Sequence, residues 1–171
     1  MLCSAPCRRY RDAPYGDGVI TLPCERRKNR ADQSESEQID MDETFHHFAV
    51  DEEGFRIEAV LQRMGNDYLV SVWGGAAHIG AVAMAQSRPS LADSGRLSAS
   101  ASVFCYLGHK EDDLAKKVAE RLAAALGAKV VVVAGIHWDN LKPQGIEQIV
   151  KNVFALVDRV IQRERAGTNR G

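Results

Sequence analysis

Three glycine-containing loops hold most of the side chains that are able to do chemistry. Each loop lies at the end of a segment expected to be a strand, and glycine lets the backbone there approach a neighbour or a ligand closely. If the loops converge, their histidines could bind a metal ion and leave one coordination position open. Loop histidines that bond to backbone groups are commoner, so the residues alone leave metal binding as an alternative and no metal ligand is assigned. The loops and their histidines are GGAAHIG (74–80, His78), GHKEDD (108–113, His109) and GIHWDN (135–140, His137).

The second and third loops also contain groups that suit an anionic or a flat ligand. GHKEDD is expected to open a helix, whose free N–H groups bind anions, and Lys110 adds positive charge. Glu111, Asp112 and Asp113 follow, however, and they would satisfy the helix dipole themselves and repel a phosphate. Trp138 is either a platform that stacks on a flat ligand or a plug of the core. No Ser-His-Asp or Cys-His arrangement is recognisable, so no catalytic residue is predicted.

The composition indicates one globular domain with room for an appendage. The chain has 171 residues, of which 45% are hydrophobic and 26% charged, and its net charge is -1. That charge gives no reason to expect nucleic acid or an anionic membrane as a partner. No apolar run approaches the roughly 20 residues that span a bilayer, and no secretory signal is recognisable, so the cytoplasm is expected. The spacing of Cys3, Cys7, Cys24 and Cys105 fits no common zinc module.

The first fifty residues differ from the rest in charge pattern. Residues 8–30 are rich in arginine, and residues 32–53 contain many acids but no lysine or arginine. Such blocks bury too little apolar surface to offset the entropy of ordering. We therefore expect residues 1–52 to be mostly disordered, residues 53–165 to form the folded domain, and residues 166–171 to be a disordered tail.

Hydrophobic periodicity predicts four strands, a helix, a fifth strand and a second helix. Apolar residues alternate in the strands and recur every three or four residues in the helices. This β-β-β-β-α-β-α order predicts an α+β two-layer sandwich, with a mainly antiparallel sheet and two helices on one face. The expected strands are 55–63, 68–73, 79–86, 96–105 and 129–136, and the expected helices are 110–127 and a segment that begins at Pro143.

The sheet face away from the helices is expected to carry small residues rather than charge. Ala81, Ala83, Ser98 and Ser100 are assigned to it. Because such a face usually needs a partner, we expect a homodimer.

Three longer strings, taken in order, resemble a known family. They are GGAAHIGAVAMAQSRPS, LSASASVFCYLGHKEDDLAKKVAERLA and VVVVAGIHWDNLKPQGIEQIVKNV. Together they resemble the LpdD-type small subunit of bacterial gallate decarboxylase, across residues 55–163. The resemblance implies an accessory protein of a UbiD-type, non-oxidative aromatic acid decarboxylase, whose large subunit carries the chemistry on prenylated FMN. It further implies a chaperone-like role toward that flavin and a fold similar to proteasome assembly chaperones.

We therefore expect a non-catalytic accessory subunit rather than an enzyme, with the decarboxylase large subunit as its partner. Arg88 and Lys110 are expected to meet the phosphate of the prenylated FMN. Trp138 is expected to stack on the flavin ring, and the histidines and Asn140 to contact its polar edge. The expected cofactor-binding residues are His78, Arg88, His109, Lys110, His137, Trp138, Asp139 and Asn140.

Two alternatives to this function stay open. One is a small metal-dependent enzyme that uses the three loop histidines with Glu111 or Asp139. The other is a purely structural assembly subunit without a ligand.

Overall fold

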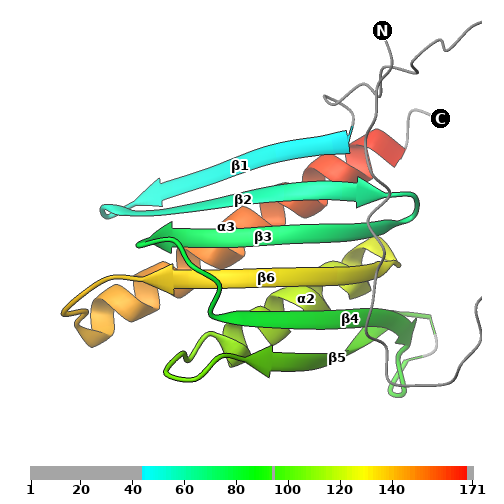
Figure 1. Ribbon diagram of the computed structural model, residues 1–171. Helices are drawn as coiled ribbons and strands as arrows, with labels where there is room; N and C mark the ends of the chain where they lie inside the picture. Colours follow the sequence, from blue (N-terminus) through cyan, green and yellow to red (C-terminus); the bar gives the residue numbers. More distant parts are fainter. Residues whose placement is uncertain (1–43, 94, 169–171) are drawn as a thin grey trace, which may run out of the picture. The chain divides into compact units, whose positions relative to one another are not determined.

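The computed structural model describes residues 44–93 and 95–168, which lie in one compact unit, Gln38–Gly171. Its elements are β1 (Phe45–Glu52), β2 (Phe55–Met64), β3 (Asp67–Gly75), β4 (Ala81–Pro89), β5 (Leu97–Cys105), α2 (Asp112–Leu126), β6 (Lys129–His137) and α3 (Pro143–Thr168). The strands form one sheet in the order β1-β2-β3-β6-β4-β5, with both helices on one face (Figure 1). β3 and β6 are parallel, and the other neighbours are antiparallel. This arrangement confirms the predicted α+β sandwich, with one strand more than expected.

The additional strand is β1, so the predicted disorder is wrong for residues 45–52. Phe48 and Val50 point toward the helices, opposite Ala59 and Ile57 of β2, and Val50 is only 2% exposed. Ala49 lies between them, but two histidines precede Phe48 and two acids follow Val50, and this polar composition conceals the period of two. At the other end, α3 continues to Thr168, beyond the expected start of the tail. Residues 1–43 and 169–171, also predicted to be disordered, lie outside the described residues.

The core lies between the sheet and the two helices. α2 packs on β4, β5 and β6, and α3 packs on β1 and β2. α2 buries three alanines, whose small side chains allow a close approach to the alanines of β4. Ala81 and Ala83 are 0% exposed under this helix, so their assignment to the opposite face of the sheet is wrong. Among the described residues, no helix is long and apolar enough to cross a membrane.

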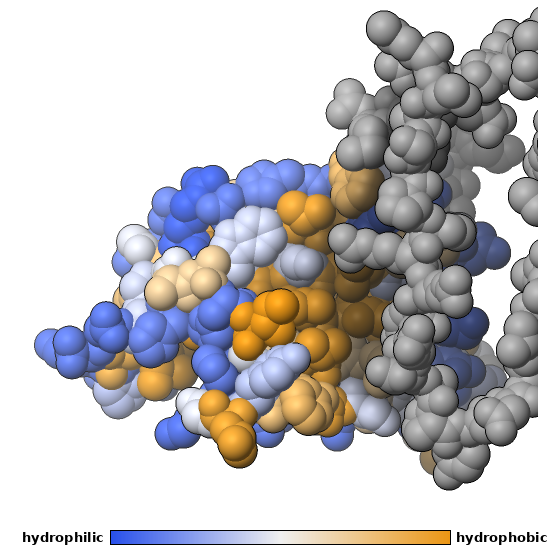
Figure 2. Space-filling view, in the orientation of Figure 1, coloured by the Kyte–Doolittle hydropathy of each residue, from blue (hydrophilic) through white to orange (hydrophobic). Residues whose placement is uncertain are grey.

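The face of the sheet away from the helices, here called the open face, is apolar at its centre. Met84 is 60% exposed and is paired with Ser102 of β5 and Val131 of β6. Phe104 is 62% exposed and lies opposite Val82. Figure 2 views this face and shows an apolar area over the central strands. The open face therefore carries large apolar side chains where the sequence predicted mainly small ones.

Candidate functional site

The three glycine-containing loops meet at one end of the sheet, as the alternative of a metal site requires. The parallel strands β3 and β6 end there side by side. β4 runs in the opposite direction and begins there, and β5 returns to end beside it. Backbone hydrogen bonds of 2.9 Å join the loops, from Ala76 N–H to His137 O and from Tyr106 N–H to Gly80 O.

His78, His109 and Glu111 form a compact cluster at this meeting point. His78 Nε2 lies 3.1 Å from Glu111 Oε1 and 3.1 Å from His109 Nδ1. His109 Nδ1 lies 3.6 Å from Glu111 Oε2. The Glu111 side chain is 12% exposed, and the two histidines are 24% and 34% exposed. The cluster is therefore partly sheltered but reachable from solvent.

Two glycines make room for this cluster. A Cβ atom at Gly80 would lie 2.7 Å from Cδ and Oε2 of Glu111. A Cβ atom at Gly135 would lie 1.7 Å from the carbonyl oxygen of His78. Because carbon atoms do not approach so closely, these neighbours can occupy their places only beside glycine. The glycines of GGAAHIG and GIHWDN thus position the cluster.

The surroundings of Glu111 favour its charged form. Burial raises the pKa of the carboxyl. Backbone hydrogen bonds from Lys110, from Glu111 itself and from Ile136, together with the adjacent His78 ring, lower that pKa and outweigh burial. The carboxyl pKa therefore lies below its usual value, and the site holds a carboxylate beside two imidazoles.

His137 belongs to a different contact. Its ring centroid lies 6.2 Å from that of His78, in an edge-on arrangement. Its Nε2 atom lies 3.2 Å from Asp139 Oδ1, and both side chains are exposed. The structure therefore brings two of the three predicted histidines together with Glu111, rather than all three.

A cleft of about 390 Å³ lies next to the cluster, between the start of α2, the end of β6 and the start of α3. Apolar side chains form much of its wall, while the polar part of the wall consists of His109, Lys110, Glu111, Asp113 and His137. The wall residues include Leu114, Ile136, Leu141, Ile146, Ile149 and Val150.

Ile146 is one of the apolar residues of the cleft wall, and it is less buried than the periodicity of its helix indicates. The apolar period places it on the buried stripe of α3, but it is 50% exposed. The first turns of α3 project past the end of the sheet, so this apolar residue faces the cleft (Figure 1). The one sequence feature that hints at this exposure is the position of Ile146 in the first turn after Pro143, at the start of the helix.

Trp138 lies elsewhere, against the core. Its ring packs where Cβ atoms of Gly74 and Gly75 would be, and it meets Phe55 edge-on at 5.5 Å. It is half-buried, so the structure favours the core plug over the expected stacking platform. Asn140 is exposed, with a φ of 56°, and lines a separate hollow beside Trp138.

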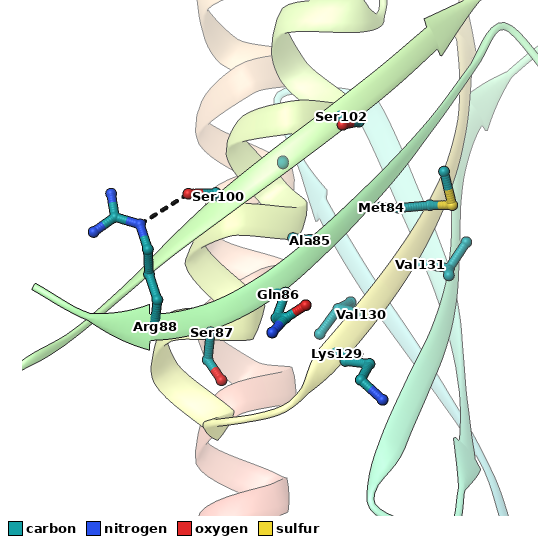
Figure 3. Close-up of a pocket in the computed structure, with 11 residues that line it drawn as sticks. Met84, Ala85, Gln86, Ser87, Arg88, Ser100, Ser102, Lys129, Val130 and Val131 are labelled. Atoms are coloured by element: carbon teal, nitrogen blue, oxygen red, sulfur yellow. Dashed lines mark hydrogen bonds between the residues drawn. The ribbon is translucent and has the colours of Figure 1, made fainter.

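Arg88 is at the opposite end of the sheet. It lies seven positions after Ala81 in β4, which corresponds to about 23 Å of extended chain. Its Nε donates a 2.8 Å hydrogen bond to Ser100 Oγ, beside a hollow of about 520 Å³ that Lys129 and Met84 also line (Figure 3). Arg88 therefore does not share a rim with Lys110, contrary to the prediction.

Comparison with known proteins identifies the sequence family of this chain. Among curated proteins, none matches it. A solved structure described as "Crystal Structure of a Novel Chaperone Complex for Yeast 20S Proteasome Assembly" is similar at 11% identity, with a TM-score of 0.40, over 66% of this chain and 98% of that one. The family model described as the prenylated flavin chaperone LpdD-like domain matches residues 51–165. That match covers most of the chain and includes all three loops, so the chain belongs to the prenylated flavin chaperone LpdD-like family.

Proposed function

We propose that this chain is a non-catalytic accessory protein that holds prenylated FMN for a UbiD-type aromatic acid decarboxylase. Membership of the LpdD-like family supports the flavin, and the cleft beside the loop cluster is the observation that carries the proposal. The bound flavin would supply decarboxylation chemistry in the partner enzyme. This chain's own residues would bind and shield it.

The residues of the cleft fit such a group. A volume of about 390 Å³ lies in the range of small-molecule sites, which are mostly apolar with a few polar groups. Leu114, Ile136 and Ile146 offer an apolar surface for the flavin ring and prenyl group. Lys110 offers a cation for the phosphate. Two acids also line the cleft. Lys117 pairs with Asp113 at 2.5 Å and offsets its charge, and Glu111 faces His78 and the Lys110 backbone N–H.

The structure changes which residues we propose for this task. His109, Lys110 and His137 line the cleft and stay in the proposed flavin site. Arg88 and Trp138 are no longer part of the proposed site. Arg88 lies at the far end of the sheet, and Trp138 packs against the core. His78, Asp139 and Asn140 are neighbours of the cleft rather than part of its wall.

We also propose that the chain associates through the open face, as a homodimer. The exposure of Met84 and Phe104 supports this, because large apolar patches are uncommon on surfaces that stay in water. The cleft lies at one end of the sheet, whereas the open face is the broad surface of the sheet away from the helices. A dimer formed there would leave the cleft available for the decarboxylase large subunit.

Titration with reduced prenylated FMN without oxygen, followed by absorbance, tests the flavin site. Lys110→Ala should weaken binding about tenfold or more, since a hydrogen bond to a charged group contributes about 1.5–3 kcal/mol. Arg88→Ala removes the same charge at the other end of the sheet and is the matched control, expected to bind within about twofold of wild type.

Two results would contradict the proposal in different ways. Weaker binding in Arg88→Ala with normal binding in Lys110→Ala would move the site to the hollow in Figure 3. If the wild type did not bind prenylated FMN at all, direct handling of the flavin would be excluded.

A further inference from the structure

His78, His109 and Glu111 present more lone pairs to one another than protons. The carbonyl oxygen of Ala76 can only accept, so His78 Nδ1 carries the proton of their 2.9 Å contact. Neutral His78 then points the lone pair of Nε2 at Glu111 Oε1 and at His109 Nδ1, each 3.1 Å away. His109 can donate its single Nδ1 proton to only one neighbour. At least one contact between two acceptors is left, and either an extra proton or a bound cation would resolve it.

The spacing of the two ring nitrogens and the carboxylate oxygens fits a metal ion. Ligand atoms held at about 2.0–2.1 Å from a tetrahedral ion lie about 3.4 Å from one another. His78 Nε2 lies 3.1 Å from His109 Nδ1 and 3.1 Å from Glu111 Oε1, whereas His109 Nδ1 lies 3.6 Å from the other carboxylate oxygen, Oε2. We propose that His78 Nε2, His109 Nδ1 and the Glu111 carboxylate bind one divalent transition-metal ion, with Zn²⁺ the best match. Two imidazoles suit such ions better than Mg²⁺ or Ca²⁺, which prefer oxygen ligands.

Groups around the cluster hold the ligands as outer-shell partners do in metal sites. The Ala76 carbonyl fixes the tautomer of His78, leaving Nε2 free to coordinate. The Lys110 N–H donates to Glu111 Oε2 at 2.9 Å and orients the carboxylate. The exposure of both imidazoles lets water or a ligand complete the coordination. Metal binding is a property of this chain alone and does not depend on the flavin proposal.

Zinc binding by the full chain is the direct test. The protein is freed of metal with a chelator, and Zn²⁺ is then added at increasing concentration, with bound metal measured by elemental analysis after dialysis. Co²⁺ serves as a second probe, because its visible absorption reports tetrahedral coordination. The variants are His109→Ala and Glu111→Gln. His47→Ala is the matched control, because His47 also contacts a carboxylate, that of Glu58 at 2.9 Å, but on β1 and β2.

We expect the wild type and His47→Ala each to bind one Zn²⁺ per chain at this cluster. His109→Ala and Glu111→Gln should lose this ion or bind it at least tenfold more weakly. Zinc held elsewhere, including by cysteines, stays bound in all four proteins and cancels in the comparison. Equal zinc binding by all four proteins, or none by the wild type at about 10 μM, would overturn the proposal. Circular dichroism checks folding. If His109→Ala is unfolded, Glu111→Gln decides, because it preserves the size of the side chain.

Discussion

Trp138 and His137 are neighbours in the chain, yet they serve different sides of the molecule. Successive side chains of a strand point to opposite faces. His137 is the last residue of β6 and is exposed beside Asp139. Trp138 turns toward Phe55 and closes that end of the core. A tryptophan in a chemically rich loop is therefore a packing residue here.

Trp138→Ala should destabilise the fold rather than act only on binding. Truncating a buried tryptophan typically costs 3–5 kcal/mol, and for this half-buried ring we expect about 3 kcal/mol. Denaturant unfolding of the variant measures the loss. His137→Ala, one residue away and exposed, should change stability by less than about 0.5 kcal/mol and is the control. If the Trp138→Ala protein were as stable as wild type, Trp138 would not be a packing residue, and its role as a stacking platform would be favoured.

The sequence revealed the loops and their histidines, but not which histidines meet. Their glycines predicted close backbone approach, and Gly80 and Gly135 do provide it. The separation of His137 from the cluster depends on where β6 ends and on its pairing with Asp139. Neither can be read from residue types. Arg88 was misplaced for a similar reason, since only the strand direction shows that it lies at the far end of β4.

At the scale of elements, Asn152 ties α3 to the first hairpin. It is 0% exposed, and its Nδ2 donates to the carbonyl oxygens of Glu52 and Phe55 at 3.0 and 2.7 Å. Gln148 Nε2 in turn donates to Asn152 Oδ1 at 2.8 Å. The turn between β1 and β2 contains Glu53 at a φ of 54°, a conformation that needs support from its surroundings. One amide thus links a helix to an unusual turn.

Replacing Asn152 with Leu keeps the volume but removes both donors. Two carbonyl groups near the core then lack a partner, so we expect a loss of about 1–3 kcal/mol in the free energy of unfolding. Lys151→Leu is the matched control, because the same side chain is placed one residue away on the exposed side of α3. Thermal unfolding followed by circular dichroism compares the two. Equal stability of both variants would mean that the hairpin does not depend on this contact.

β1, the strand that was not predicted from the sequence, shows a limit of predicting strands from residue patterns. β1 contains two histidines and two acids among eight residues, so its average composition resembles the charged segment before it. Its place in the sheet depends on the hairpin that it forms with β2 and on contacts with α3, which is distant in sequence. Arg159 of α3, for example, donates to the Ala49 carbonyl at 2.7 Å. The remaining elements carried enough apolar periodicity to be predicted from local pattern.

At the scale of the whole molecule, the two faces of the sheet have different tasks. α2 and α3 cover one face of the sheet, and alanines of β4 and α2 on that side allow α2 to approach the sheet closely. The open face has large exposed apolar residues, and none of the helices in the described part of the chain covers it. Ala83 belongs to the first face and Met84 to the second, although they are adjacent in β4. Substitutions at these two positions therefore separate folding from association.

Met84→Glu should shift the proposed dimer toward monomer and leave the fold intact. A carboxylate at the centre of an apolar interface would lose its water without gaining a partner, so we expect at least tenfold weaker association. Leu91→Glu is the matched control, because Leu91 is 94% exposed in the loop after β4 and outside the sheet. Ala83→Arg should instead prevent folding, since it places a charge under α2 at a position that is 0% exposed. Sedimentation velocity at micromolar concentration, with circular dichroism for folding, measures both effects. A monomeric wild type, or a Met84→Glu protein that associates as strongly as Leu91→Glu, would show that the open face serves another partner.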